Sequence, residues 1–350
     1  TGTGVEVYTR TNNASGMVVA VLNSKVVGED GKETITLPHY GGPTGYAKKI
    51  YETDFTVEQV RSDKTYNICF SGVDYIATVY VNGQELAHHR TGYTGFRVEI
   101  TDAVNLDEET TVAVKLDTTE NPAVPPFGFV IDYLTYGGLY REVWLDVRNQ
   151  SFVSDIYITT PTTESVRLEI AAQQEQGCAY HIEIQDADGF ILMRKLACDD
   201  IMEFPVPGVQ PWSHKNPYLY TCVVSLEKDG QVLDCHHVKF GFRTVEARAD
   251  GFYLNGEKVF LRGLNRHQCY PYVGYAAPER LQREDARILK QELGCVIART
   301  SHYPQSHHFI DECDKLGLLV FTEIPGWQHV GNDSWQEQAI ENTREMVMQY

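Results

Sequence analysis

Three polar clusters in the last third of the chain contain the residues best suited to chemistry. They are Asn265-Arg-His267, Arg299-Thr-Ser-His-Tyr-Pro304 and Glu323-Ile-Pro-Gly-Trp327, with His329 just beyond the third. A single histidine is more often a hydrogen-bonded structural residue than a ligand. Titratable, polar and aromatic groups at three separate places are harder to explain in that way. They predict a ligand site to which all three clusters contribute.

Each cluster follows a short apolar segment that we expect to be a buried strand. These segments are Val259-Phe-Leu261, Cys295-Val-Ile-Ala298 and Leu318-Leu-Val-Phe321. The carboxyl ends of parallel strands meet at one edge of a sheet, and barrel enzymes place their sites there. The three clusters are therefore expected to converge.

Apolar residues with helical spacing separate and follow these strands. We expect helices over 278–293, 306–316 and 335–350, with Gly294 and Gly317 ending the first two. The order β-α-β-α-β-α, with no hairpin returns, predicts parallel strands joined by right-handed crossovers. Three such units cannot close an eight-stranded barrel, so the segment reads as the first three βα units of a (β/α)8 TIM barrel.

The third expected strand would form an open edge of this partial barrel. Parallel strands are apolar on both faces, so the side chains from Leu318 to Phe321 would lie uncovered. We expect one of three remedies, namely more chain, a second copy of the molecule, or packing of the segment against the preceding domains.

The chain before this segment is expected to be entirely β. Residues 1–150 contain short alternating runs and an Asn82-Gly83 hairpin turn, which predict a jelly-roll sandwich. Residues 151–247 contain about seven short strands with turns at Asp188-Gly189 and Asp229-Gly230, which predict an immunoglobulin-like sandwich. With residues 248–350 as the partial barrel, the fold class is multi-domain β plus α/β.

Composition excludes several partners. The chain has 350 residues, 30 Lys and Arg against 48 Asp and Glu, and a formal charge of −18. Nucleic acids and anionic membrane surfaces are bound through Lys and Arg, so neither is expected as a partner. No apolar run is long enough to span a bilayer. The eight cysteines form no C-x-x-C pair and are expected to be mostly buried reduced thiols.

The chain opens at Thr1 without Met or a signal peptide, so we expect that the natural N-terminus lies further upstream. The compartment stays open, with the cytoplasm favoured. A homo-oligomer also stays open.

Several segments together resemble glycoside hydrolase family 2, the β-galactosidase and β-glucuronidase family. Arg262-Gly-Leu-Asn-Arg-His267 and Arg299-Thr-Ser-His-Tyr-Pro304 resemble its barrel motifs. Further resemblances lie in the two β domains, at Tyr80-Val-Asn-Gly83 with Gly92-Tyr-Thr-Gly-Phe96, at Asp132-Tyr-Leu-Thr-Tyr-Gly-Gly-Leu-Tyr-Arg141, and at Phe240-Gly-Phe-Arg243. The resemblance covers the chain from about Leu37 onward.

The resemblance implies retaining hydrolysis of a terminal β-glycoside. That reaction uses two carboxyl groups about 5–5.5 Å apart, one as acid/base and one as nucleophile. In the family both are glutamates that lie beyond the third barrel strand. Neither is expected within these 350 residues, and the chain alone is expected to be inactive. Glu323 stands at a strand end, but its family counterpart is a supporting residue.

The resemblance assigns roles in sugar binding to four residues and a supporting role to one. His267 and His302 are expected to hydrogen-bond sugar hydroxyls, and Asp132 is expected to reach the far end of the glycone from the jelly roll. Trp327 offers a flat apolar face for stacking on a sugar, with core packing as the alternative. Arg299 is expected to brace the nucleophile, lowering its pKa.

A metal site is not predicted, and no cofactor is expected. Some β-galactosidases of the family bind magnesium through Glu-x-His after the third strand, but here Trp327-Gln-His329 lacks the carboxylate. The adjacent pairs His88-His89, His236-His237 and His307-His308 are also treated as poor chelators, because neighbouring side chains on a strand point to opposite faces.

The interpretation is therefore the N-terminal portion of a retaining exo-β-glycosidase, with a carbohydrate as substrate. A β-galactosidase is preferred and a β-glucuronidase is second. The alternative from another class is a carbohydrate-binding fragment without catalysis.

Overall fold

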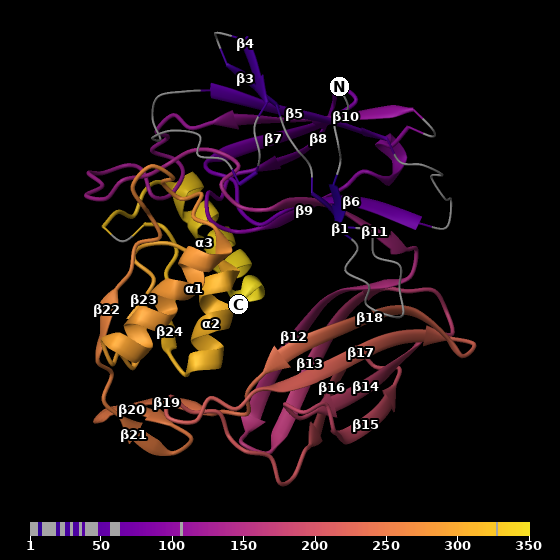
Figure 1. The fold of residues 1–350 in the computed structure, drawn as a ribbon, viewed down its shortest axis with the longest axis vertical. Coiled ribbons are helices and arrows are strands. Elements are labelled where there is room, and N and C mark those ends of the chain that lie inside the picture. The colour runs from indigo at the N-terminus through magenta and orange to yellow at the C-terminus, as the bar shows by residue number, and fades with distance from the viewer. Residues whose placement is uncertain are drawn as a thin grey trace.

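The computed structural model describes residues 6–8, 19–21, 25–28, 31–34, 37–38, 48–56, 64–105, 108–326 and 328–350. They form two β-sandwiches and a third segment in which helices accompany a small parallel sheet (Figure 1). In Figure 1 the first sandwich is at the top, the second at the lower right and the third segment at the left. No helix in the described part of the chain has the length and apolar character needed to cross a membrane.

The first sandwich consists of two antiparallel sheets. One has the order β1 (Glu6–Tyr8), β2 (Val19–Val21), β11 (Val143–Asn149), β6 (Lys64–Phe70) and β9 (Phe96–Glu99). The other has the order β4 (Gly31–Thr34), β3 (Lys25–Gly28), β5 (Lys48–Thr56), β10 (Glu109–Asp117), β7 (Ile76–Val81) and β8 (Gln84–His89). A short 3-10 turn, Thr101–Ala103, follows β9. The predicted jelly-roll sandwich is confirmed.

Alternation of apolar residues forms the core of this sandwich. Ile68 on β6 and Leu145 on β11 lie in one buried cluster with Val79 on β7 and Val114 on β10. The predicted hairpin joins β7 to β8 at Asn82-Gly83, where both residues have positive φ, 49° and 81°. That conformation suits the twist of the flanking strands and favours Asn-Gly.

The second sandwich has seven antiparallel strands in two sheets, as predicted. The sheets are β12 (Phe152–Thr162), β13 (Ser165–Gln173) and β16 (Ile201–Pro205), and β15 (Ile191–Ala197), β14 (Ala179–Gln185), β17 (Tyr220–Lys228) and β18 (Gln231–Phe240). Asp229-Gly230 is a two-residue turn with positive φ at both positions. The turn at Asp188-Gly189 is longer, because Asp186 and Phe190 close it through the N–H of Asp186.

The third segment begins with an antiparallel sheet of β19 (Val245–Arg248), β20 (Gly251–Leu254) and β21 (Glu257–Val259). β19 crosses position 247, where we place the domain boundary, and pairs with β20. The parallel sheet follows, with β22 (Gly263–Asn265), β23 (Ile297–Arg299) and β24 (Leu319–Phe321) in that order. The predicted parallel arrangement is confirmed, but its first strand is Gly263–Asn265 and not the expected Val259-Phe-Leu261. Val259 instead ends the antiparallel β21, and Phe260 and Leu261 are exposed.

Three helices accompany the parallel sheet: α1 (Glu279–Arg287), extended by a π-helical turn over Ile288–Glu292, α2 (His307–Leu316) and α3 (Asp333–Gln349). Ser306 and Asn332 cap α2 and α3 by accepting hydrogen bonds from backbone N–H groups. Gly294 and Gly317 follow the first two helices with φ of 66° and 75°, as the C-terminal glycine pattern predicts.

The third strand is better covered than its open edge suggests. Leu318 is buried with Phe309 and Cys313 of α2, and Leu319 is buried against Trp212 of the second sandwich. Phe321 alone among the apolar residues of this strand is clearly exposed, at 59%. The third of the expected remedies is therefore observed, because the segment packs against a preceding domain and Trp212 covers Leu319.

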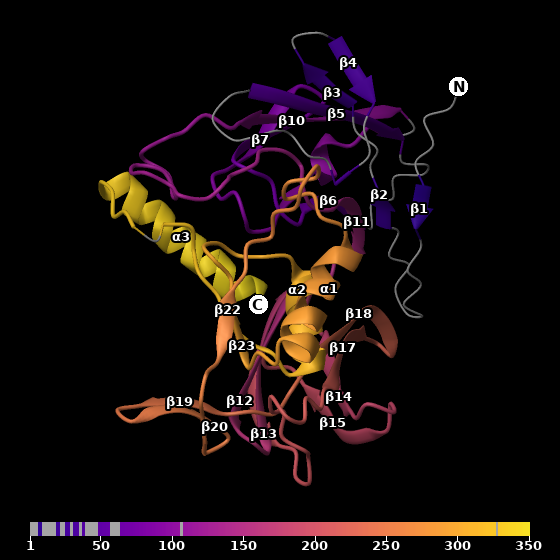
Figure 2. The same cartoon turned by 60° about the vertical axis from the view of Figure 1, so that its left-hand side comes forward.

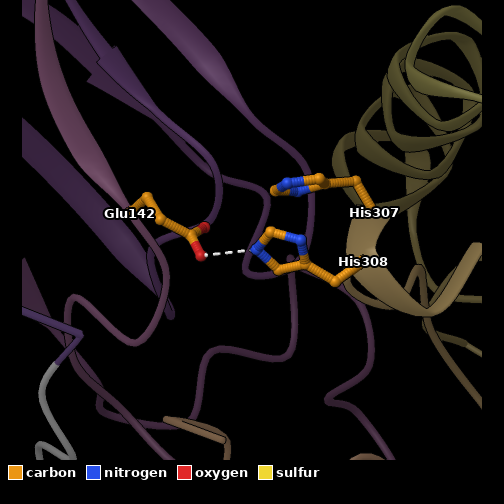
Figure 3. A group of neighbouring side chains, drawn as sticks. All are labelled: Glu142, His307 and His308. Atoms are coloured by element: carbon orange, nitrogen blue, oxygen red, sulfur yellow. Dashed lines mark hydrogen bonds and ion pairs between the residues drawn. The ribbon is translucent and has the colours of Figure 1, made fainter. Parts of the chain in front are cut away.

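The first sandwich is joined to the third segment by buried polar contacts. The guanidinium of Arg141 donates to the backbone oxygens of Tyr93 (2.7 Å) and Pro304 (3.0 Å). Glu142, the next residue, meets the first turn of α2 through His308 at 3.0 Å (Figure 3). α3 lies along the same sandwich (Figure 2), and Thr91 donates to Asn342 at 2.8 Å.

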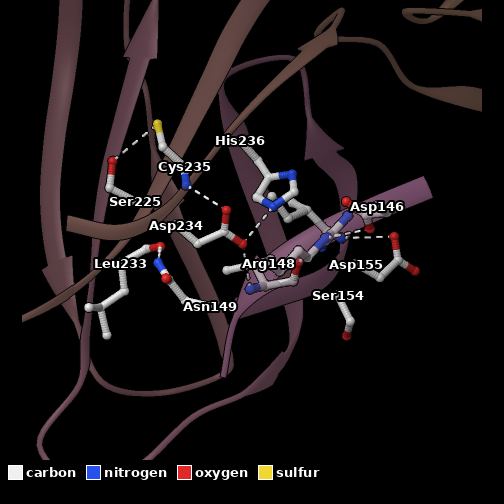
Figure 4. A network of polar contacts seen from close by, with 12 residues as sticks. Asp146, Arg148, Asn149, Ser154, Asp155, Ser225, Leu233, Asp234, Cys235 and His236 are labelled. Atoms are coloured by element: carbon white, nitrogen blue, oxygen red, sulfur yellow. Dashed lines mark hydrogen bonds and ion pairs between the residues drawn. The ribbon is translucent and has the colours of Figure 1, made fainter. Parts of the chain in front are cut away.

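A polar network at the end of β11 joins the two sandwiches (Figure 4). Asp234 on β18 accepts from the backbone N–H of Val153 (2.8 Å) and contacts His236 (2.9 Å). Arg148 donates to Asp146 and to the carbonyl of Val153. Burial opposes ionisation of Asp234, but His236 and the Val153 N–H outweigh it and lower the pKa of this carboxyl. The network fixes the first strand of the second sandwich.

Candidate glycone-binding site

The ends of the three parallel strands bring the predicted clusters together. Asn265 pairs with Arg299, and Arg299 pairs with Phe321, in the parallel register. The residues that follow each strand therefore leave the sheet at the same edge, as predicted.

Glu323 is the centre of the charged part of the site. One carboxylate oxygen is ion-paired with Nε of Arg299, and the other lies 3.1 Å from Nδ1 of His302. Nη2 of Arg299 lies 3.3 Å from the same histidine nitrogen. Glu323 is thus held by two partners, which fits a supporting carboxylate that orients His302. Arg299, predicted to brace a nucleophile, is paired with Glu323.

His267 lies beside His302 with its ring centroid 5.3 Å away and the two planes nearly perpendicular. Its Nδ1 is 3.3 Å from the hydroxyl of Tyr303. Burial, and next the charge of His302, lower the pKa of His267, while Asp132 and Glu323 act in the opposite direction. A neutral imidazole offers one donor and one acceptor, as vicinal hydroxyls require.

A loop of the first sandwich reaches the barrel strand ends. The ring of Tyr133 lies 5.4 Å from that of His267 and 5.6 Å from that of His302. Asp132 next to it is exposed and near enough for its charge to affect the pKa of His267. The role of Asp132 in sugar binding stays a prediction.

Trp327 lies outside the described residues. His329 contacts Trp335 edge to face, with ring centroids 5.5 Å apart, and lies against Gly128 of the first sandwich, where an added Cβ would collide with its ring. It therefore connects the third segment to the first sandwich.

Arg266, between Asn265 and His267, points away from the site. Its guanidinium is buried and bonds to Asp285 (2.8 Å) and Gln282 (2.7 Å) of α1 and to Gln305. It ties β22 to the helices rather than facing a ligand. Sequence alone cannot make this distinction, because neighbouring residues after a strand have no fixed direction.

A cluster of buried tyrosines beneath the two histidines was not predicted. Tyr93 and Tyr140 come from the first sandwich, and Tyr275 and Tyr303 from the third segment. The rings of Tyr93 and Tyr303 are stacked, with centroids 4.5 Å apart. Tyr133 was also missed as a site residue. The Tyr-rich loop of residues 132–140 was visible in the sequence, but only Asp132 was singled out from it.

Other cavities do not coincide with these residues. A cavity of about 860 Å³ lies between the second sandwich and the end of α3, lined among others by Tyr157, His236 and Tyr350. None of the predicted site residues that the structure describes lines this cavity. Among the described residues, one group of three potential metal ligands lies close together, Glu142 with His307 and His308. It is located at α2, away from the sequence position considered for magnesium.

The two sandwiches, the parallel βα segment and the polar cluster at its strand ends are the arrangement of a multidomain glycoside hydrolase. Residues 245–348 match the TIM barrel domain of the family 2 glycosyl hydrolases. Residues 151–243 match the family 2 glycosyl hydrolase model, and residues 44–124 match the galactose-binding domain-like model of glycosyl hydrolase 2. The chain belongs to glycosyl hydrolase family 2.

The relatives that are similar to the chain include β-galactosidases and a putative β-glucuronidase. The β-galactosidase of Thermoanaerobacter pseudethanolicus is 38% identical over 343 residues, covering 91% of this chain and 46% of the relative. The β-galactosidase of Thermoanaerobacterium thermosulfurigenes is 40% identical over 342 residues, covering 90% of this chain and 48% of the relative. A putative β-glucuronidase of Formosa agariphila is 30% identical, covering 91% and 41%. The chain thus spans about half the length of these relatives.

Solved structures show the same arrangement. An FMN-binding β-glucuronidase from Facaelibacterium prausnitzii superposes with a TM-score of 0.86 at 26% identity, covering 96% of this chain and 56% of that one. A putative β-galactosidase from Bacteroides fragilis gives 0.83 at 27% identity, with 95% and 57% covered.

Proposed function

We propose that this chain supplies the glycone-binding part of a retaining exo-β-glycosidase, most directly a β-galactosidase. The observation that carries the proposal is the meeting of His267, His302 and Glu323 with the loop of the first sandwich that carries Asp132 and Tyr133. Paired donors and acceptors from two sides suit a polyhydroxylated ring better than an elongated or purely apolar ligand.

Each side chain has a role set by its chemistry. His267 and His302 hydrogen-bond sugar hydroxyls. Glu323 contacts Nδ1 of His302 and so holds that imidazole in a fixed orientation. Asp132 accepts hydrogen bonds from hydroxyls on the far side of the glycone. Tyr133, whose pKa burial raises, stays protonated and packs against both histidines. Glycoside hydrolysis by two carboxyl groups needs no cofactor, and we propose none.

The reacting carboxyl groups are proposed to lie outside residues 1–350. Both carboxylate oxygens of Glu323 are engaged, one with Arg299 and the other with His302. A nucleophile needs a carboxylate oxygen that is directed at the anomeric carbon. The chain by itself is therefore proposed to bind the glycone side without turning it over.

The preference for a galactoside rests on the relatives and on charge. The two relatives near 40% identity bear the name β-galactosidase. A glucuronide would bring a carboxylate that requires a cation, and Arg299 at the described strand ends is already paired with Glu323. A β-glucuronidase remains the second candidate, because a relative at 30% identity and a solved structure carry that name.

The test compares aryl β-galactosides and aryl β-glucuronides as substrates of the intact protein. We expect kcat/KM to be larger for the galactoside, with retention of configuration at the anomeric carbon. Preference for the glucuronide would select the second candidate. Binding of sugar with no turnover of either substrate by the intact protein would favour a non-catalytic carbohydrate-binding protein.

Residues 1–350 expressed alone provide a further test. We expect no turnover of either substrate. Turnover by a preparation free of contaminating glycosidase would contradict the proposed location of the catalytic carboxyl groups and give Glu323 a direct catalytic role.

A further inference from the structure

Two adjacent histidines of α2 face a carboxylate of the first sandwich. His307 and His308 form the first turn of the helix, and Glu142 immediately precedes β11 (Figure 3). Nε2 of His308 is 3.0 Å from Oε1 of Glu142, and the two imidazole centroids are 3.9 Å apart. One ligand atom from each residue lies within 4.8 Å of the other two.

The opposite-faces argument that we apply to adjacent histidines is wrong for this pair. That argument holds for strands, where successive side chains alternate. His307 and His308 are on a helix, and both rings turn toward the first sandwich (Figure 3). The result is a set of two imidazole nitrogens and one carboxylate oxygen contributed by two domains.

We propose that Glu142, His307 and His308 form a binding site for a divalent transition-metal ion, with Zn²⁺ as the first choice. Zinc accepts imidazole nitrogen and carboxylate oxygen at about 2.0–2.2 Å, and tetrahedral ligand atoms are then about 3.4 Å apart. The observed 3.0 Å and the upper limit of 4.8 Å bracket that spacing. All three side chains are partly exposed, so small rotations close the site and water completes the coordination.

Charge around the cluster also supports a cation. The N-terminus of α2 carries a partial positive charge and opposes a metal ion. Two carboxylates offset it, because Glu279 of α1 lies 3.8 Å from Nδ1 of His308 on the side away from Glu142. Nδ1 of His308 is buried and makes no hydrogen bond within the described chain. Glu279 is also ion-paired with Arg283 at 2.7 Å, so Glu142 is the main counter-charge for an ion.

An ion would connect the first sandwich to the third segment. The alternative is that Glu142 and His308 form an ordinary interdomain hydrogen bond. That explanation does not account for the position of His307, whose ring centroid lies 3.9 Å from that of His308 and which makes no hydrogen bond to Glu142 within the described chain. The two explanations differ in the role of His307, which binds the ion in the first and has no role in the second.

The test is a titration of the metal-free intact protein with Zn²⁺ by calorimetry. We expect one site that is weakened at least about 10-fold by His307→Gln and by His308→Gln. Glutamine retains an amide donor for Glu142, so the interdomain hydrogen bond can persist while ligation is lost. His88→Gln, at an exposed histidine on β8, is the matched control and should bind Zn²⁺ as the wild type does. Equal affinity and stoichiometry in all four proteins would overturn the proposal.

Two further measurements cover other outcomes. With Co²⁺ as the probe, an absorption spectrum without a thiolate charge-transfer band is expected, whereas such a band would place the ion at a cysteine such as exposed Cys198 and contradict the proposal. Should the variants fail to fold, crystals of wild-type protein grown with Zn²⁺ decide. An anomalous peak between Glu142 and the two histidines is expected, and a peak elsewhere or none would refute the site.

Discussion

The third segment, which contains the parallel sheet and its helices, contacts the two sandwiches through chemically different surfaces. Toward the first sandwich the contact is polar and aromatic, with buried Arg141, the tyrosine cluster and the His308 contact at its centre. Toward the second sandwich the contact is built around Trp212, which is fully buried with Leu254, Val259 and Leu319. Only the first of these contacts lies next to His267 and His302.

The difference assigns different tasks to the two β domains. A buried polar junction is costly unless each group is paired, and it is retained where polar groups have a specific use. The other junction is mainly apolar and depends chiefly on shape and volume, with the indole N–H of Trp212 hydrogen-bonded to the Asp314 carbonyl. This difference fits the proposal that the first sandwich contributes to the glycone site, whereas the second sandwich supports the third segment.

The largest expected effect is on stability, at the apolar junction. Trp212→Ala removes a buried indole and its hydrogen bond to the Asp314 carbonyl (2.8 Å), and should lower the free energy of unfolding by about 3–5 kcal/mol. The shift of the urea midpoint measures this. Activity per folded molecule should stay unchanged, with Trp212→Phe as the milder control. Loss of activity in a protein that remains folded would bring the second sandwich into the site.

The next largest effect is on catalysis, at the polar junction. His302→Ala in the intact protein should lower kcat/KM by a factor that corresponds to about 2–4 kcal/mol of transition-state binding. The same range is expected for His267→Ala. Steady-state kinetics and a urea midpoint on the same samples separate the two effects. Kinetics close to those of the wild type, in a folded protein, would mean that both histidines are structural.

A smaller effect concerns the docking of α3 on the first sandwich. Glu345 contacts His89 (3.2 Å) and accepts from Thr94. Burial disfavours its charged form, but these hydrogen bonds outweigh burial and lower the pKa of Glu345. Its stabilising effect is therefore present above the ordinary glutamate pKa and is lost as the pH falls through the depressed value of the folded state.

Glu345→Gln should accordingly lower the free energy of unfolding by about 1–2 kcal/mol near pH 6. The decrease should be smaller below about pH 4, where Glu345 of the wild type is becoming protonated. Urea unfolding of both proteins across that range measures the difference. A difference that grows on acidification would contradict the assigned direction of the pKa shift. Glu341→Gln, at an exposed position of the same helix, provides the control and should show little dependence.

Much of the fold was predictable because local rules and tertiary structure agree. Asn82-Gly83 fixes a hairpin, Gly317 ends a helix, and the order of strands and helices after residue 250 requires a parallel sheet. The convergence of His267 and His302 follows from that sheet. These features depend on backbone geometry, which short sequence patterns report well.

Side-chain direction was the part that the sequence could not supply. Arg266 and His267 are neighbours, yet one is buried among helix residues and the other joins the site. Tyr133 gains its position from packing between domains. The burial of Leu319 likewise depends on Trp212, more than a hundred residues earlier. Contacts between distant segments decide all three.

The central claim is that one sugar site is shared between the first sandwich and the barrel strands. A double-mutant cycle between Asp132→Ala and His302→Ala, with kcat/KM of the intact protein as the readout, tests it most directly. Because both side chains would contact the same glycone, we expect each change to reduce kcat/KM and their coupling to be about 0.5–3 kcal/mol. A normal kcat/KM for Asp132→Ala, or strictly additive losses within about 0.5 kcal/mol, would contradict a shared site.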